Sequence, residues 1–204
     1  MKIKTVGIVV LLALFSLPSH AGIGLKGGLN FANVTSASSI NPSSHSGYAV
    51  GVFFGTPPMG LMGYRTELLL SRQGYDFGSN TTSGSVKLDY LIMPSLMVIN
   101  IGKIAQIQAG GQIAYLLHGN VSGASTGDPA ADKILDLFNR FNYGLAGGVE
   151  VSPLKWFLIG VRLNLSLGNL YKDPSSFAEG IPPSYFPSIK AKNNVVQMYA
   201  GFQF

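Results

Sequence analysis

The stretch that most constrains the fold is residues 193–204, in which apolar residues alternate with polar and small ones. Read with the two-residue period of a strand, one face carries Val196, Met198, Ala200, Phe202 and Phe204. Such a pattern indicates a strand whose two faces meet different surroundings. An exposed strand of this kind would aggregate in water, whereas a membrane barrel gives its apolar face lipid to contact. We therefore expect the closing strand of a lipid-facing barrel, with Phe202 and Phe204 as a signal to the barrel assembly machinery.

The N-terminal residues have the three parts of a secretory signal peptide. Lys2 and Lys4 precede an apolar run over residues 6–17, and a small-x-small cleavage pattern ends at Ala21. The run is shorter than the ~20 residues that a membrane-spanning helix needs. We expect cleavage after Ala21, so that residues 1–21 form a signal peptide and residues 22–204 form an outer-membrane β-barrel domain.

The composition agrees with transmembrane strands and excludes several other classes. Mean hydropathy is +0.30, although residues 22–204 contain no apolar run of membrane-helix length. Alternating transmembrane strands give this combination. The chain has no cysteine, so no disulfide framework stabilises it. The net charge of +5 is spread thinly and forms no basic stripe, so we expect no nucleic-acid partner.

Period-two patterns predict eight strands, an even number as single-chain bacterial barrels require. The fourth is apolar on both faces, so its register is unclear, and Pro94 is unfavourable inside it. The predicted strands cover residues 23–34, 47–55, 61–75, 86–99, 104–118, 141–151, 156–168 and 193–204. We expect an all-β fold, an eight-stranded antiparallel up-and-down transmembrane barrel.

The predicted connections alternate in length. Long polar segments follow the odd-numbered strands, at residues 35–46, 76–85, 119–140 and 170–191. Short turns follow the even-numbered ones, at residues 56–60, 100–103 and 152–155. With both termini in the periplasm, this arrangement gives the short periplasmic turns and long extracellular loops of outer-membrane barrels, whereas a soluble sandwich would not sort its loops this way.

Aromatic residues on the predicted lipid face gather near the strand ends, which predicts two girdles at the membrane boundaries. The outer girdle would contain Phe31, Tyr48, Tyr115 and Tyr143. The inner girdle would contain Phe54, Tyr64, Trp156, Phe157, Phe202 and Phe204.

Several segments resemble the PorT-like outer-membrane β-barrel proteins of Gram-negative envelopes. The resemblance spans nearly all of the chain after residue 21 and is carried by residues 24–32, 66–74, 88–94, 108–111 and 138–150 and by the final strand. It implies the fold and the outer-membrane location, and an accessory role in envelope secretion by analogy alone, but no assigned activity. One position departs from the family, which usually carries a glutamate two residues before the proline where this chain has Ile92.

Charged residues on the predicted inward face indicate a lumen network. Arg65, Glu67, Glu150 and Arg162 share this face, with Lys26 as a fifth member. Side chains fill the interior of an eight-stranded barrel, so buried charges there must be paired. We interpret the five as a structural ion-pair network; a proton or ion path, or a catalytic acid, is the alternative.

No cluster has metal-ligand spacing, and we expect no metal, no cofactor and no catalytic residue. The alternative is a barrel enzyme acting on lipid or peptide at the outer rim, which would use His118 with Asp128 or Asp132. A soluble lipocalin-like carrier is a third reading, and it would need its apolar face turned inward. A short amphipathic segment, residues 132–138, would cap the barrel mouth or dock a partner.

The fourth outer loop, residues 170–191, is the candidate contact surface. Four prolines restrict it, and between them stand Tyr171, Phe177, Tyr185 and Phe186. Rigid aromatic groups are typical of binding surfaces, although the same residues would also serve as a lid on the barrel mouth. We expect a non-catalytic monomer in the outer membrane, structural or partner-binding, whose partners are lipid, the assembly machinery and an envelope protein.

Overall fold

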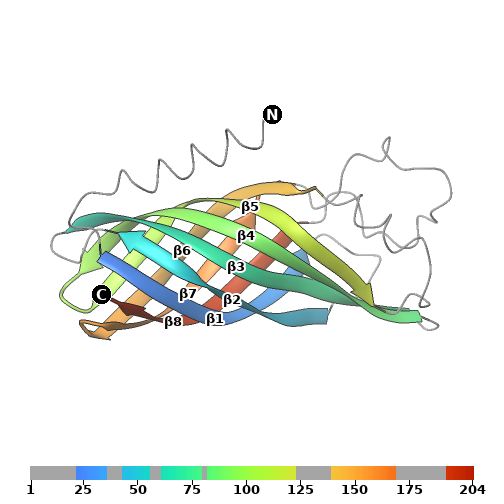
Figure 1. The fold of residues 1–204 in the computed structure, drawn as a ribbon, viewed down its shortest axis with the longest axis horizontal. Coiled ribbons are helices and arrows are strands. Elements are labelled where there is room, and N and C mark those ends of the chain that lie inside the picture. Colours follow the sequence, from blue (N-terminus) through green and yellow to red (C-terminus); the bar gives the residue numbers. More distant parts are fainter. Residues whose placement is uncertain (1–21, 36–42, 56–60, 80–81, 123–138, 169–191) are drawn as a thin grey trace.

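The computed structural model describes residues 22–35, 43–55, 61–79, 82–122, 139–168 and 192–204. These residues form a closed antiparallel barrel in which each strand pairs with its sequence neighbours and β8 closes against β1. Figure 1 shows the strands wrapping around one axis with a marked tilt. The strands are β1 Gly22–Thr35, β2 Ser43–Gly55, β3 Met62–Ser79, β4 Thr82–Ile101, β5 Ala105–Ser122, β6 Phe141–Leu154, β7 Phe157–Ser166 and β8 Lys192–Gln203.

The barrel confirms the predicted fold class and the alternation that led to it. In β8, Val195, Gln197 and Tyr199 are buried in the lumen, while Val196 and Met198 are exposed on the outside. The outside is apolar over most of its area, as it must be for a wall that contacts lipid. We call the end where β1 begins and β8 ends the inner end, and the opposite end the outer end.

The register of β4, which the sequence left open, is settled by burial. Leu88, Tyr90, Ile92, Leu96 and Val98 point into the lumen. Pro94 is also buried, and its missing amide hydrogen falls at a gap in the ladder. Strands β3 and β4 pair Thr66 with Ser95 and resume only at Leu69 with Ile92. The gap accommodates a proline inside a central strand.

One predicted connection is much shorter than expected. Residues 76–85 read as a long polar loop, but β3 continues to Ser79, β4 begins at Thr82, and their ladder runs through to the pair Ser79 and Thr82. Serine, threonine and glycine made this segment look like a loop, yet backbone pairing does not require apolar side chains. Figure 1 shows the joined ends of β3 and β4 reaching beyond the other strands. The other three predicted long connections lie mainly outside the described residues.

Candidate functional site

Five charged side chains from four strands, β1, β3, β6 and β7, meet in the inner half of the lumen. Glu67 accepts hydrogen bonds from Lys26 Nζ at 3.0 and 3.1 Å and from Arg162 Nη1 and Nη2 at 2.6 and 2.7 Å. Glu150 accepts two from Arg65 Nη1, at 2.9 and 2.7 Å. The structure thus brings together all five residues of the predicted network, in two groups.

Neutral groups join the two ion-pair groups into one layer. Gln108 donates to Glu150 at 3.0 Å and accepts from Arg162 at 2.7 Å, so its amide bridges them. The Tyr199 hydroxyl donates to Glu150 at 3.1 Å, and its ring lies 3.4 Å from Lys26 Nζ. Gln106 Oε1 accepts from Arg65 Nη2 at 3.3 Å. We call Lys26, Arg65, Glu67, Gln106, Gln108, Glu150, Arg162 and Tyr199 the ionic layer.

The ionic layer is sealed from solvent. The side chains of Glu67, Glu150 and Arg162 are 0% exposed. Large rings fill the remaining space, and glycines make room for them. A Cβ on Gly160 would lie 2.5 Å from the Tyr199 ring, and one on Gly24 would lie 2.1 Å from the Phe53 ring. Such contacts are too short for real side chains, so only glycine fits at these two positions.

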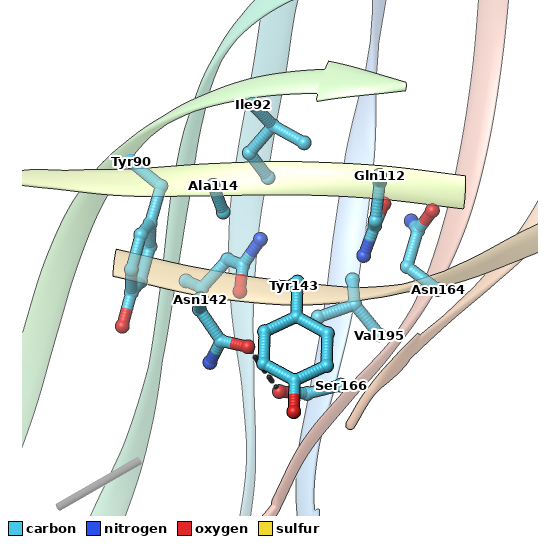
Figure 2. Close-up of a pocket in the computed structure, with 10 residues that line it drawn as sticks. Tyr90, Ile92, Gln112, Ala114, Asn142, Tyr143, Asn164, Ser166 and Val195 are labelled. Carbon is cyan, nitrogen blue, oxygen red and sulfur yellow. Dashed lines mark hydrogen bonds between the residues drawn. The ribbon is translucent and has the colours of Figure 1, made fainter. Parts of the chain in front are cut away.

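In the outer half of the lumen, the described polar side chains are neutral groups instead of charges. Asn30 Nδ2 donates to Ser71 Oγ at 2.9 Å, and Gln197 Nε2 donates to Asn30 Oδ1 at 3.0 Å. Ser166 Oγ donates to Asn142 Oδ1 at 2.8 Å (Figure 2). We call Asn30, Ser71, Gln73, Gln112, Asn142, Asn164, Ser166 and Gln197 the amide layer.

A small cavity lies within the amide layer. Its volume is about 30 Å³, and Gln112, Asn142, Asn164 and Ser166 are among the side chains around it (Figure 2). A cavity of this size holds about one water molecule, which is too little room for a substrate. Ile92, the position where the PorT-like family usually has glutamate, also lines it. The lumen here is polar but uncharged.

The structure changes the surroundings expected of His118. Asp128 and Asp132 lie outside the described residues, as does the amphipathic segment 132–138. The register instead places His118 opposite Asp89, and both face outward near the outer end. Both carboxylate oxygens of Asp89 bind Arg72, through Nε at 2.7 Å and Nη2 at 2.8 Å. Asp89 is therefore already engaged and is not placed to orient His118 as a catalytic base.

Of the other predicted site residues, the structure describes the two C-terminal phenylalanines but not the four aromatic residues of the fourth outer loop. Phe202 faces outward and stacks on Trp156, with centroids 5.8 Å apart, while Phe204 is 82% exposed. Their proposed role in assembly stays a prediction. Tyr171, Phe177, Tyr185 and Phe186 lie outside the described residues. In the part of the chain that the structure covers, no group of three or more histidines, cysteines or carboxylates is placed to hold a metal.

Sequence reasoning missed the neutral members of the ionic layer. Gln106, Gln108 and Tyr199 are all buried on the inward face. Their signal was present, because Gln106 and Gln108 fall on the same face of β5 as Gln112, and Tyr199 shares its face with Gln197. Arg72 and Asp89 were missed as well. Arg72 alternates in step with Leu68 and Leu70, so the sequence pattern assigned it to the outward face and not to the lumen network.

A closed barrel with an apolar outside and a polar, filled lumen defines the class of outer-membrane barrel proteins. The family described as outer membrane protein beta-barrel domain matches residues 16–172, and the chain belongs to it. The search among curated proteins gave no match. Within the described residues, no helix is long and apolar enough to cross a membrane.

Solved structures of three outer-membrane or surface proteins are similar to this chain. Neisserial surface protein A (NspA) has a TM-score of 0.50 at 11% identity, covering 90% of this chain and 99% of its own. Ail, the attachment invasion locus protein of Yersinia pestis, has 0.49 at 14%, covering 91% and 99%. OprG of Pseudomonas aeruginosa has 0.45 at 12%, covering 90% and 96%. At such identity the likeness to NspA concerns the fold alone.

Proposed function

We propose that this protein is a non-catalytic barrel of the outer membrane, closed to solutes, that acts through its outer surfaces and not through its lumen. The observation that carries the proposal is the ionic layer. A solute on the barrel axis would have to pass Glu67, Glu150 and Arg162, whose side chains are completely buried. The interior of an eight-stranded barrel is just wide enough for side chains to fill.

The contacts of the ionic layer also oppose its use as an ion path. Each carboxylate is bound by at least two donors from different strands. Displacing either one would leave buried cations without a counter-charge, which costs several kcal/mol. A permeating ion would have to break these pairs.

Conductance of the purified full-length barrel in planar lipid bilayers tests this proposal. We expect a flat baseline at neutral pH, with an open porin as the positive control and the heat-denatured protein as the negative one. Reproducible unitary current steps from the folded protein would overturn the proposal, because a sealed lumen cannot carry them.

We propose further that the chain is PorT-like and that its outer end meets an envelope partner, as in a secretion or assembly accessory. Support comes from the motifs shared with that family and from Tyr171, Phe177, Tyr185 and Phe186 in the segment 170–191. Replacing residues 175–188 with a Gly-Ser linker should leave membrane insertion and heat resistance intact, since the strands make their own hydrogen bonds. Cross-linking to an envelope partner in intact cells should be lost.

Two outcomes of the loop replacement would count against the contact surface. Unchanged cross-linking would mean that another part of the outer end makes the contact. Loss of heat resistance would mean that the segment acts as a lid on the barrel. The matched control replaces residues 56–60, which connect β2 and β3, with the same number of Gly and Ser residues. This change should leave cross-linking unchanged.

The alternative function, an enzyme at the outer rim, has one observation in its favour, namely the register pair of His118 and Asp89. We do not favour it because Arg72 holds both oxygens of Asp89. Hydrolase and acyl-transfer assays on lipid and peptide, comparing wild type with His118→Ala, should show no difference. Activity that disappears in His118→Ala would establish the alternative.

A further inference from the structure

Four neighbouring strands carry a row of polar side chains on the outside of the barrel near its outer end. Arg72 on β3 lies with its guanidinium carbon 5.3 Å from the centre of the Tyr48 ring on β2. It binds Asp89 on β4, which pairs in register with His118 on β5. We call Tyr48, Arg72, Asp89 and His118 the outer charged row. Figure 1 shows that β2 to β5 follow one another around the wall.

The height of the row matches the outer boundary of the membrane. Tyr64, in the inner aromatic girdle, and Arg72 face outward on the same strand, eight residues apart. At ~3.4 Å per residue and a tilt of ~40°, this separation is about 20 Å along the membrane normal. The apolar band of such barrels is ~25 Å tall, so the backbone of Arg72 lies within about 5 Å of its outer edge, and the long side chain can bring the guanidinium to the lipid headgroups.

Among the described side chains, the charged members of the row lie on β3, β4 and β5, while β8 carries the neutral Asn194 on its outward face near the same end. Near the same end of β1, β6 and β7, the outward-facing residues are Phe31, Tyr143 and Leu165. Next to the row on the side towards the inner end, the outer surface of the wall becomes apolar, with Leu70 paired to Leu91. A molecule bound there would thus meet charge at one end and an apolar surface below it, which is the chemistry of a lipid.

The charge balance of the row favours an anionic headgroup. Asp89 uses Nε and Nη2 of Arg72, while the described residues supply no acceptor for Nη1. Lys87 stands two residues before Asp89 on β4, on the same outward face and closer to the outer end. It is exposed and has no ion-pair partner among the described residues. Two cations therefore face one carboxylate, and that carboxylate fixes the guanidinium over Tyr48. Arginine presents a planar fork suited to phosphate, and lysine adds a point charge.

We propose that the outer charged row, together with Lys87, binds the phosphate of a membrane-lipid headgroup, with the acyl chains lying on the apolar wall below. This inference goes beyond the proposed function, because it concerns lipid on the side of the barrel and holds whether or not the outer end meets a protein. It also gives a reason for charged residues on a surface where charge is unfavourable.

Lipid titration of the folded, full-length protein in an uncharged detergent tests the site. The probe is an acylated glucosamine disaccharide carrying two phosphates, compared with the same lipid without phosphate. Binding is followed by native mass spectrometry. Wild type should prefer the phosphorylated lipid. The double variant Arg72→Gln with Lys87→Gln should bind the phosphorylated lipid about tenfold more weakly. Each cation near a membrane surface strengthens binding several-fold, and Asp89 offsets part of the contribution of Arg72.

The matched control is Lys103→Gln with Lys155→Gln, which removes the same charge from two exposed turns at the inner end. It should leave binding unchanged. The single variant Lys87→Gln should weaken binding about fivefold. It breaks no contact among the described residues, so it keeps the test valid if the double variant folds poorly.

Three results would overturn the proposal. The double variant could bind the phosphorylated lipid as tightly as wild type. The control could lose as much affinity as the double variant, which would reduce the effect to overall charge. Inorganic phosphate in large excess could displace the lipid completely, which would make the site one for a free anion and not for a lipid.

Discussion

The two halves of the lumen solve the same packing problem with different chemistry. In the ionic layer, three cations and two carboxylates from four strands depend on one another, and Gln108 joins the two groups. In the amide layer, neutral groups form two separate sets of hydrogen bonds, one centred on Asn30 and the other joining Ser166 to Asn142 beside a cavity of about 30 Å³. Removing a buried charge leaves its partner uncompensated, whereas removing an amide leaves only an unmet hydrogen bond. From this comparison we infer that the ionic layer closes the barrel and that the amide layer tolerates change.

The largest effect is expected from Glu67→Gln in the ionic layer. This change keeps the shape but removes the carboxylate that both Lys26 and Arg162 bind. Two buried cations would lose their counter-charge, so the barrel should lose about 3–5 kcal/mol of unfolding free energy. Urea titrations of folding in lipid vesicles measure it. A loss no larger than that of an amide-layer variant would remove the distinction between the halves.

A smaller effect is expected from Asn30→Ala in the amide layer. Asn30 Nδ2 donates to the Tyr48 and Arg72 carbonyls as well as to Ser71 Oγ, and its Oδ1 accepts from Gln197. Because all partners are neutral, we expect a loss of about 1–3 kcal/mol in the same titration. If Asn30→Ala destabilised the barrel as much as Glu67→Gln, the amide layer would have to be regarded as an equally coupled network.

The smallest effect is expected from Tyr199→Phe, which separates the hydroxyl from the ring. The ring over Lys26 stays, while the bond to Glu150 is lost. Glu150 keeps Arg65 and Gln108, so the loss should be about 1 kcal/mol. Thermal unfolding, followed by the shift of the folded band on a gel, can rank this variant against the other two. A ranking above Asn30→Ala would show that the hydroxyl organises the layer.

Much of the fold could be predicted because strand alternation is a local property. Residues 193–204 alone assign the inward and outward faces of β8, and the same reading placed Arg65 and Glu67 on the lumen side of β3. Strand ends were harder. The serine- and threonine-rich residues 76–85 continue a ladder that only backbone pairing defines.

The partners within the candidate site could not be predicted in the same way. Glu67 meets Lys26 and Arg162 across separations of 41 and 95 residues. Those meetings depend on the stagger and tilt of all eight strands, which alternation does not encode. The outer charged row escaped notice because β4 is apolar on both faces, so Asp89 could not be assigned to a side until Leu88 and Tyr90 were found buried.

A pair of double-mutant cycles tests the central contrast most directly. One cycle combines Arg65→Gln with Glu150→Gln in the ionic layer, and the other combines Asn30→Ala with Gln197→Ala in the amide layer. For the first, we expect a coupling energy of about 2 kcal/mol or more, with the double variant more stable than either single one. For the second, we expect at most about 1 kcal/mol. Equal couplings, or additive losses for Arg65 and Glu150, would contradict the account that paired charges close this barrel.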